Sequence, residues 1–144
     1  MLHHHALEID QRENQGIVIL DLDGKLEMGR GDIALREFAE SVLKQGKRQV
    51  ILNMARVSEI DTAGNGVLLI LAQEYRDAGG RLALLKVDRV HAAVYEMARL
   101  ETVIQIYDAE VDAVNSFFPD RAAPRYDILE FVEHLQHEEQ NDQK

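Results

Sequence analysis

Short apolar stretches alternate along the chain with longer segments in which apolar residues recur every three or four positions. Residues 6–9 and 16–22 show the first pattern, which is typical of β-strands. Asp23 and Gly24 follow as a predicted turn. Because the two strands are close in the sequence, we expect them to pair as a hairpin.

A helix is predicted next, over residues 32–45, with Gly46 as its stop. Its apolar residues follow helical spacing: Leu35, Phe38, Ala39, Val42 and Leu43. Residues 49–54 then form a nearly continuous apolar run, which favours a strand covered on both faces. This strand is therefore expected in the interior of a sheet.

Strand and helix patterns continue to alternate after this strand. A strongly apolar helix is predicted from Thr62 to about Ala78, ended by Gly79 and Gly80, with strands at 81–87 and 103–107. Helical spacing predicts one helix between these strands and a short closing helix after them, through Val90, Val94, Met97, Ala98 and Leu100 and through Val111, Val114, Phe117 and Phe118. This order implies right-handed crossovers onto a largely parallel sheet, which is the α/β class.

The two prolines of the chain, Pro119 and Pro124, predict a domain boundary. Residues 1–118 would form one domain, and 119–144 an extension with a short amphipathic helix containing Ile128, Phe131, Val132 and Leu135. That helix would either pack on its own domain or serve docking or homodimer formation.

Composition narrows the classes of partner. The 144 residues include 16 Lys and Arg against 26 Asp and Glu, a formal net charge of -10, which opposes direct binding to nucleic acid or to an anionic membrane. No cysteine is present, which excludes disulfides and thiolate chemistry. The longest apolar run, 67–72, is too short to span a bilayer, and the first residues lack signal-peptide features, so a cytoplasmic protein is expected.

No set of residues with catalytic or metal-binding spacing is evident. The nearest carboxylate group, Asp61 and Glu59 with Asp21, Asp23 and Glu27, lacks a basic partner for acid–base chemistry. His134 and His137 lie three residues apart but are typical of a solvated acidic helix, as the histidines at 3–5 are of a solvated terminus. We therefore expect no enzyme activity, no cofactor and no metal.

The turn before the apolar helix carries the most information. Asp61 or Thr62 can be its N-cap, and Gly64 and Gly66 lower helix propensity but permit another backbone to approach closely. A phosphate on Thr62 would lie at the positive end of the helix dipole while meeting Asp61 and Glu59 as like charges. Such a turn suits a switch better than a catalyst.

These features together resemble a STAS domain, the domain of bacterial anti-sigma-factor antagonists. The resemblance covers about residues 6–118 and is carried by the segments Gly24–Glu27, 50–54, Asp61–Gly66 and Ala78–Gly80 and by Ala113. It implies a mixed sheet flanked by helices and a partner that is an anti-sigma factor, often also a serine/threonine kinase.

In that family, phosphorylation of the hydroxyl after the aspartate of the turn releases the partner, and a phosphatase restores binding. By position the phosphorylated residue is Thr62, and the expected partner-binding residues are Glu27, Asp61, Thr62, Ala63, Gly64, Asn65 and Leu68. The chain departs from the family pattern at three places, with Thr62 for serine, Asn65 for leucine and Asn53 for a frequent aspartate. Asn65, an amide in place of an apolar contact, would alter partner choice or weaken the docking mode of the family.

Two functions remain open on these grounds. The first is a phosphorylation-switched anti-sigma-factor antagonist. The second is a constitutive structural subunit of a phospholipid-transport complex or a stressosome-like assembly, in which Thr62 is only a helix cap. A small-ligand-binding or nucleotide-binding enzyme is a distant third.

Overall fold

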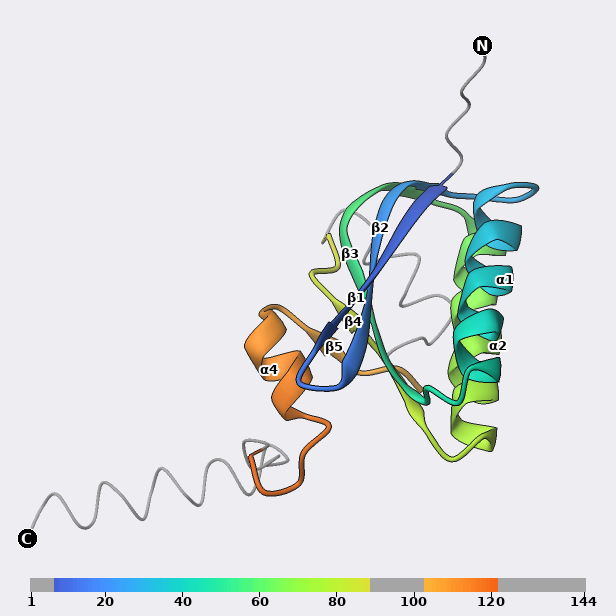
Figure 1. Ribbon diagram of the computed structural model, residues 1–144. Coiled ribbons are helices and arrows are strands. Elements are labelled where there is room, and N and C mark those ends of the chain that lie inside the picture. The colour runs from blue at the N-terminus through green and yellow to red at the C-terminus, as the bar shows by residue number, and fades with distance from the viewer. Residues whose placement is uncertain (1–6, 89–102, 122–144) are drawn as a thin grey trace, which may run out of the picture.

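The fold is a mixed sheet between two layers of helices. A computed structural model describes residues 7–88 and 103–121. Within them, strands β1 to β5 form one sheet in the order β1-β2-β3-β4-β5. Helices α1 (Gly31–Lys44) and α2 (Thr62–Asp77) lie on one face, and α4 (Glu110–Asn115) lies on the other (Figure 1).

The first two strands form the predicted hairpin. β1 (Leu7–Asn14) and β2 (Ile17–Leu26) pair antiparallel. The turn between them is made by Gln15 and Gly16, with φ angles of 55° and 83°. Positive φ at both central residues matches the right-handed twist of the strands, so the turn closes the hairpin without splaying it.

The remaining strands add in parallel. β3 (Gln49–Ile60) pairs with β2 on one side and β4 (Arg81–Leu85) on the other, and β5 (Ile106–Tyr107) pairs with β4. The prediction that the apolar run at 49–54 lies inside the sheet is confirmed. So is the mixed, largely parallel α/β class.

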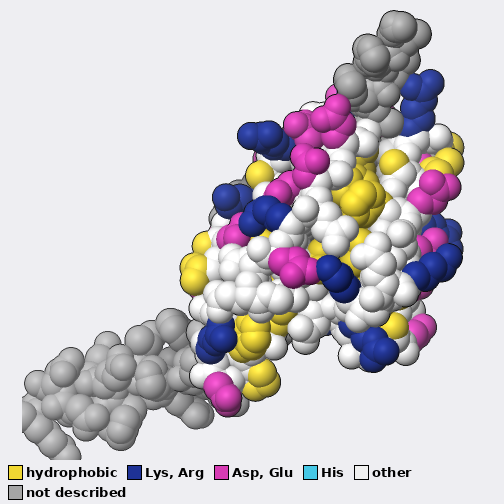
Figure 2. Space-filling model, in the orientation of Figure 1, with side chains coloured by type: hydrophobic (Ala, Val, Ile, Leu, Met, Phe, Trp, Pro, Cys, Tyr) yellow, Lys and Arg dark blue, Asp and Glu magenta, His cyan; other side chains and the backbone are white. Residues whose placement is uncertain are grey.

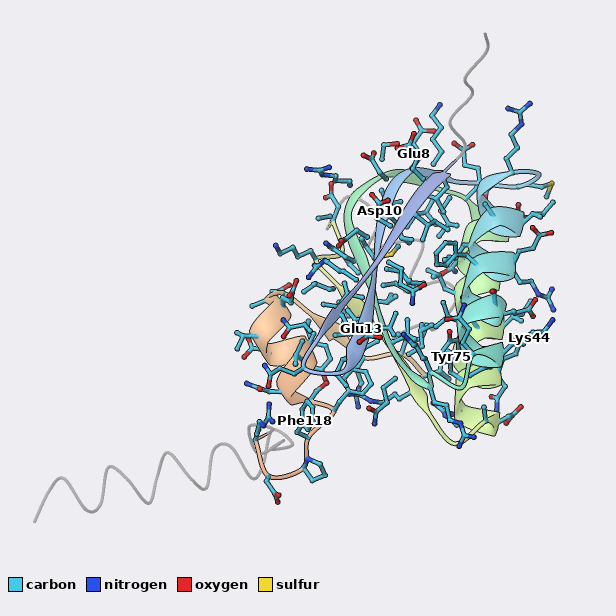
Figure 3. All side chains as sticks on the ribbon, viewed as in Figure 1. Glu8, Asp10, Glu13, Lys44, Tyr75 and Phe118 are labelled. Atoms are coloured by element: carbon cyan, nitrogen blue, oxygen red, sulfur yellow. The ribbon has the colours of Figure 1, made fainter. Side chains whose placement is uncertain are left out.

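A hydrophobic core fills each face of the sheet. The larger one lies under α1 and α2, and the smaller one under α4. Tyr75 joins the two long helices (Figure 3): its ring is fully buried, and its hydroxyl donates to the Ala39 carbonyl of α1 at 2.6 Å. Because a buried hydroxyl without a partner would destabilise the fold, this bond fixes α2 against α1.

Three strands are longer than predicted: β1 continues from residue 9 to Asn14, and β2 and β3 are also extended. The turn expected at Asp23 and Gly24 is wrong, since β2 continues through it to Leu26, and β3 continues from residue 54 to Ile60. Gly24 has a φ of 126° and lies where the β2–β3 register shifts, which is the conformational role of a glycine at a bulge. The apolar side chains beyond it, Leu26, Val57 and Ile60, are buried, and their burial extends both strands.

Two other strands are shorter than predicted. β4 ends at Leu85, before Lys86, whose φ of 57° leaves the extended region, and β5 is confined to Ile106–Tyr107. The predicted helix near residues 90–100, the extension from residue 122 onward and the histidines at 3–5, 91, 134 and 137 lie outside the described residues.

The packed part of the chain extends past the predicted boundary to Arg121. The Arg121 guanidinium lies 4.0 Å from the centre of the Phe118 ring and also bonds Gln15 in the hairpin turn. We predict that truncation after Arg121 leaves one cooperative unfolding transition in urea, with a midpoint close to that of the full chain. Loss of cooperativity would show that residues 122–144 belong to the core.

Candidate functional site

The turn between β3 and α2 is held by Asp61. Its Oδ1 accepts from the Gly64 amide at 2.8 Å, and its Oδ2 accepts from the Met28 amide at 2.9 Å. Asp61, rather than Thr62, is thus the N-cap of α2. The same carboxylate fixes the β2–α1 loop beside the start of α2.

Gly64 brings the first turn of α2 against the end of β2. A Cβ at Gly64 would lie 2.1 Å from the Leu26 carbonyl oxygen, whereas a Cβ at Gly66 would meet nothing within 4 Å. The Asp61 amide also donates to the Leu26 carbonyl at 3.3 Å. The close backbone approach expected from the two glycines is therefore made by Gly64.

The Thr62 side chain is exposed, and Glu27, Asp61 and Ala63 are half-buried around the same turn. Gly64, Asn65 and Leu68 do not fit the predicted role of surface contacts, because Gly64 is buried and Asn65 and Leu68 retain only 3% and 0% of their exposure. Their positions on α2 face the sheet and its core. Leu68 follows Thr62 by six residues, which is somewhat less than two helical turns. The two side chains therefore point in different directions from α2, and that of Leu68 faces the core.

Two exposed apolar residues beside this turn were missed by sequence reasoning. Met28 retains 75% of its exposure and Ile33 retains 50%. Ile33 falls between the buried positions Gly31 and Leu35 of α1, so its place off the apolar stripe could have identified it. Met28 follows a strand whose end was misplaced, and no sequence signal distinguished it.

Carboxylates surround the Thr62 turn. A carboxyl–carboxyl hydrogen bond with Glu59 is the largest of the influences that raise the pKa of Glu27, followed by loss of solvent and by the charges of Glu59 and Asp61. For Asp61, loss of solvent raises the pKa, but the amides of Met28, Gly64 and Ala63 together outweigh it and lower the pKa below its ordinary value. Asp61 is thus a stable anion next to the Thr62 hydroxyl.

The carboxylates predicted to gather here divide between two surfaces. Asp21 binds Arg12 at 2.6 Å and accepts from Asn53 at 2.8 Å, while Arg12 also binds Glu110 of α4 at 2.6 Å. These contacts join the hairpin to α4, and hydrogen bonding to Arg12 is the main cause that lowers the pKa of both Asp21 and Glu110. Asp21 and Asp23 are therefore not part of the Thr62 site.

Acidic side chains also follow β1 on the surface (Figure 2), including Glu8, Asp10 and Glu13, which Figure 3 labels. A hollow of about 280 Å³ on the sheet includes Asp10, Asp21 and Asp23 in its lining. No group of three or more potential ligands among the described residues has a metal-binding arrangement.

The match of the whole domain to a known family decides its class. The sequence profile of the STAS domain matches residues 8–113. The chain belongs to the STAS domain family. That match includes β1 through most of α4, and hence the entire Thr62 turn and its supporting loop.

Relatives of this STAS protein are named as anti-sigma factor antagonists. It is 25% identical over 108 residues to the anti-sigma F factor antagonist of Paenibacillus polymyxa, covering 75% of this chain and 92% of the relative. An anti-sigma factor antagonist from Mycobacterium paratuberculosis has the same fold, with a TM-score of 0.70 and 12% identity. The match covers 81% of this chain and 98% of the Mycobacterium protein.

The same fold is found in SpoIIAA of Bacillus, solved in two states. The unphosphorylated form superposes with a TM-score of 0.60, 23% identity, and coverage of 77% of this chain and 96% of SpoIIAA. The phosphorylated form superposes with a TM-score of 0.59 and 22% identity, and the match covers 77% of this chain and 98% of SpoIIAA. In the part of this chain that the structure describes, no helix has the length and apolar character needed to cross a membrane.

Proposed function

We propose that this STAS protein is an anti-sigma-factor antagonist that binds its anti-sigma factor through the surface around unmodified Thr62 and is released when Thr62 is phosphorylated. The observation that carries the proposal is the exposed Thr62 hydroxyl at the start of α2, beside an Asp61 carboxylate that forms the cap. The name of the Paenibacillus relative supports the choice of partner.

The proposed switch depends on charge at this surface. A phosphate would add about -1.5 to -2 charges at pH 7 next to Asp61 and Glu59. The α2 dipole would offset only about 0.3–1 kcal/mol of that repulsion, whereas removing a phosphate from water under a docked partner costs much more. Phosphorylation would therefore prevent docking without unfolding the domain.

In this proposal the protein acts by occupying its partner and catalyses no reaction. The anti-sigma factor, or a separate serine/threonine kinase, would phosphorylate Thr62, and a phosphatase would restore the free hydroxyl. The surface that remains available to the partner consists of Glu27, Asp61, Thr62 and Ala63, because the other predicted contacts are buried. Asn65 would influence the partner only indirectly, by its packing beneath the turn.

The test is calorimetric titration of each anti-sigma factor of the source organism, expressed singly, with the purified protein. We expect phosphorylated protein and Thr62→Glu to bind at least about tenfold more weakly than wild type, while Thr62→Ala binds as well as wild type and accepts no phosphate at this site. Circular dichroism should show the same fold for all forms.

Ser41→Glu is the matched control, because Ser41 is an exposed hydroxyl residue farther along α1. It adds the same charge away from the Thr62 turn and should leave binding unchanged. Equal affinities of wild type, Thr62→Ala and phosphorylated protein would contradict the switch and favour a constitutive subunit. Absence of binding to every anti-sigma factor would contradict the proposed partner.

A further inference from the structure

The loop between β2 and α1 projects beside the N-terminal ends of α1 and α2 (Figure 1). Its residue Met28 has the largest exposed fraction, 75%, of the large hydrophobic residues that the structure describes as exposed. Ile33, in the first turn of α1, is 50% exposed. Two apolar side chains thus reach solvent next to the carboxylates of the Thr62 turn.

Hydrogen bonds on both sides of Met28 hold the loop. The Met28 amide donates to Asp61 Oδ2 at 2.9 Å, and the next amide, that of Gly29, donates to Asp32 Oδ1 at 2.8 Å. The Asp32 amide in turn donates to the Glu27 carbonyl at 3.1 Å. These bonds span the two ends of the loop, so its backbone is fixed before any partner arrives.

Two glycines make this conformation available. Gly29 has a φ of 95°, in the region that favours glycine. A Cβ at Gly31 would lie 2.1 Å from the Lys25 carbonyl oxygen, so only glycine permits α1 to begin so close to β2. The sequence therefore builds a tight loop whose outward apolar side chain is not required by the core.

We propose that Met28 is the specificity-determining contact of the Thr62 surface, inserted into an apolar pocket of the anti-sigma factor. This inference rests on the proposed function and identifies the residue that selects the partner. The apolar pocket follows from the exposure of Met28 and Ile33. The partner is the one proposed for the Thr62 surface, because the Met28 amide donates to Asp61 Oδ2 and so makes the Met28 loop continuous with that surface.

Contact residues with large effects on affinity lose all their solvent in the complex, and a backbone that is already rigid reduces the entropy lost on binding. Methionine is flexible and fits pockets of varied shape, but truncation to alanine removes most of its apolar area. Complete burial of this side chain corresponds to a change in Kd of about tenfold to a hundredfold.

The test compares Met28→Ala with Val111→Ala in titrations against the single anti-sigma factor that binds unmodified wild type. Val111 is 61% exposed but belongs to α4 on the opposite face of the sheet, so it controls for the loss of an exposed aliphatic group. We expect Kd to rise about tenfold or more for Met28→Ala and less than about twofold for Val111→Ala. Met28→Leu, which retains the volume, should bind nearly as wild type.

The result distinguishes this inference from the proposal on which it rests. If Met28→Ala binds within about twofold of wild type while Thr62→Glu binds weakly, the switch stands and Met28 is not the specificity determinant. If wild type binds no anti-sigma factor, both proposals fail. Because the Met28 side chain is exposed, thermal unfolding should be the same for each Met28 variant, and an equal loss of affinity in Val111→Ala would overturn the inference.

Discussion

Gly64→Ala is expected to lower the free energy of unfolding by about 3 kcal/mol, whereas Gly66→Ala, two residues further along α2, is expected to raise it by about 0.5–1 kcal/mol. The added methyl group is the same in both variants. Only its surroundings differ, because the Gly64 methyl would overlap the Leu26 carbonyl oxygen at 2.1 Å and the Gly66 methyl would meet open space.

The Gly64 overlap involves atoms that cannot move freely. The Leu26 carbonyl belongs to the last residue of β2 and already accepts from the Asp61 amide at 3.3 Å. Relief would need α2 to move away from the sheet, which would open the core around Leu26 and Leu68, both fully buried. The gain in helix propensity from replacing glycine, at most about 1 kcal/mol, is too small to offset this.

Urea unfolding of the two variants and wild type at one pH measures both effects. Equal stabilities for Gly64→Ala and wild type would show that the approach of α2 to β2 is looser than described. A Gly66 methyl group would lie outside the core. Titration of Gly66→Ala against the anti-sigma factor would therefore also show whether the partner covers α2 beyond Thr62, because a covered methyl group would change the affinity.

Hydrophobic periodicity predicted most of the architecture. The interior position of the run at 49–54 follows from its apolar character, and the helix from Thr62 follows from its spacing, because both depend on burial against the same sheet. The ends of β2 and β3 could not be read in this way. They depend on pairing between distant segments, which let Gly24 continue a strand where local preference indicated a turn.

The candidate site was also predicted only in part, because local sequence determines some of its residues and contacts across the fold determine the others. Asp61 and Thr62 stand at a helix start that local sequence specifies, and the structure places them there. The family resemblance implies Gly64, Asn65 and Leu68 as partner contacts, but the direction of each residue is set by which side of α2 meets the sheet. Met28 belongs to the site only through the bond between its amide and Asp61, a contact across the fold.

Asp61→Ala is expected to lower the free energy of unfolding by about 2–4 kcal/mol, because it removes two hydrogen bonds from a charged acceptor and leaves the amides of Met28 and Gly64 without that partner. Asp61→Asn should have a smaller effect. Asparagine is an equally good N-cap and keeps one oxygen for the Gly64 amide, but its side-chain NH2 cannot accept from Met28.

The pH dependence of these variants tests the charge itself. The pKa of Asp61 is lowered in the folded protein. The stability that its carboxylate charge contributes is therefore fully present above the pKa of Asp in the unfolded chain, about 4, and is lost as pH falls through the pKa of the folded state. The difference in unfolding free energy between wild type and Asp61→Asn should therefore be constant above about pH 5 and shrink below about pH 4.

Subtracting the two urea titrations at each pH removes the contributions of Asp21 and Glu110, whose pKa values are also lowered and which are present in both proteins. A difference that stays constant from pH 7 down to about pH 2 would mean that the Asp61 carboxylate gains nothing from its charge. In that case the amide of Met28 would be held by geometry alone, and the fixed position of the β2–α1 loop would need another cause.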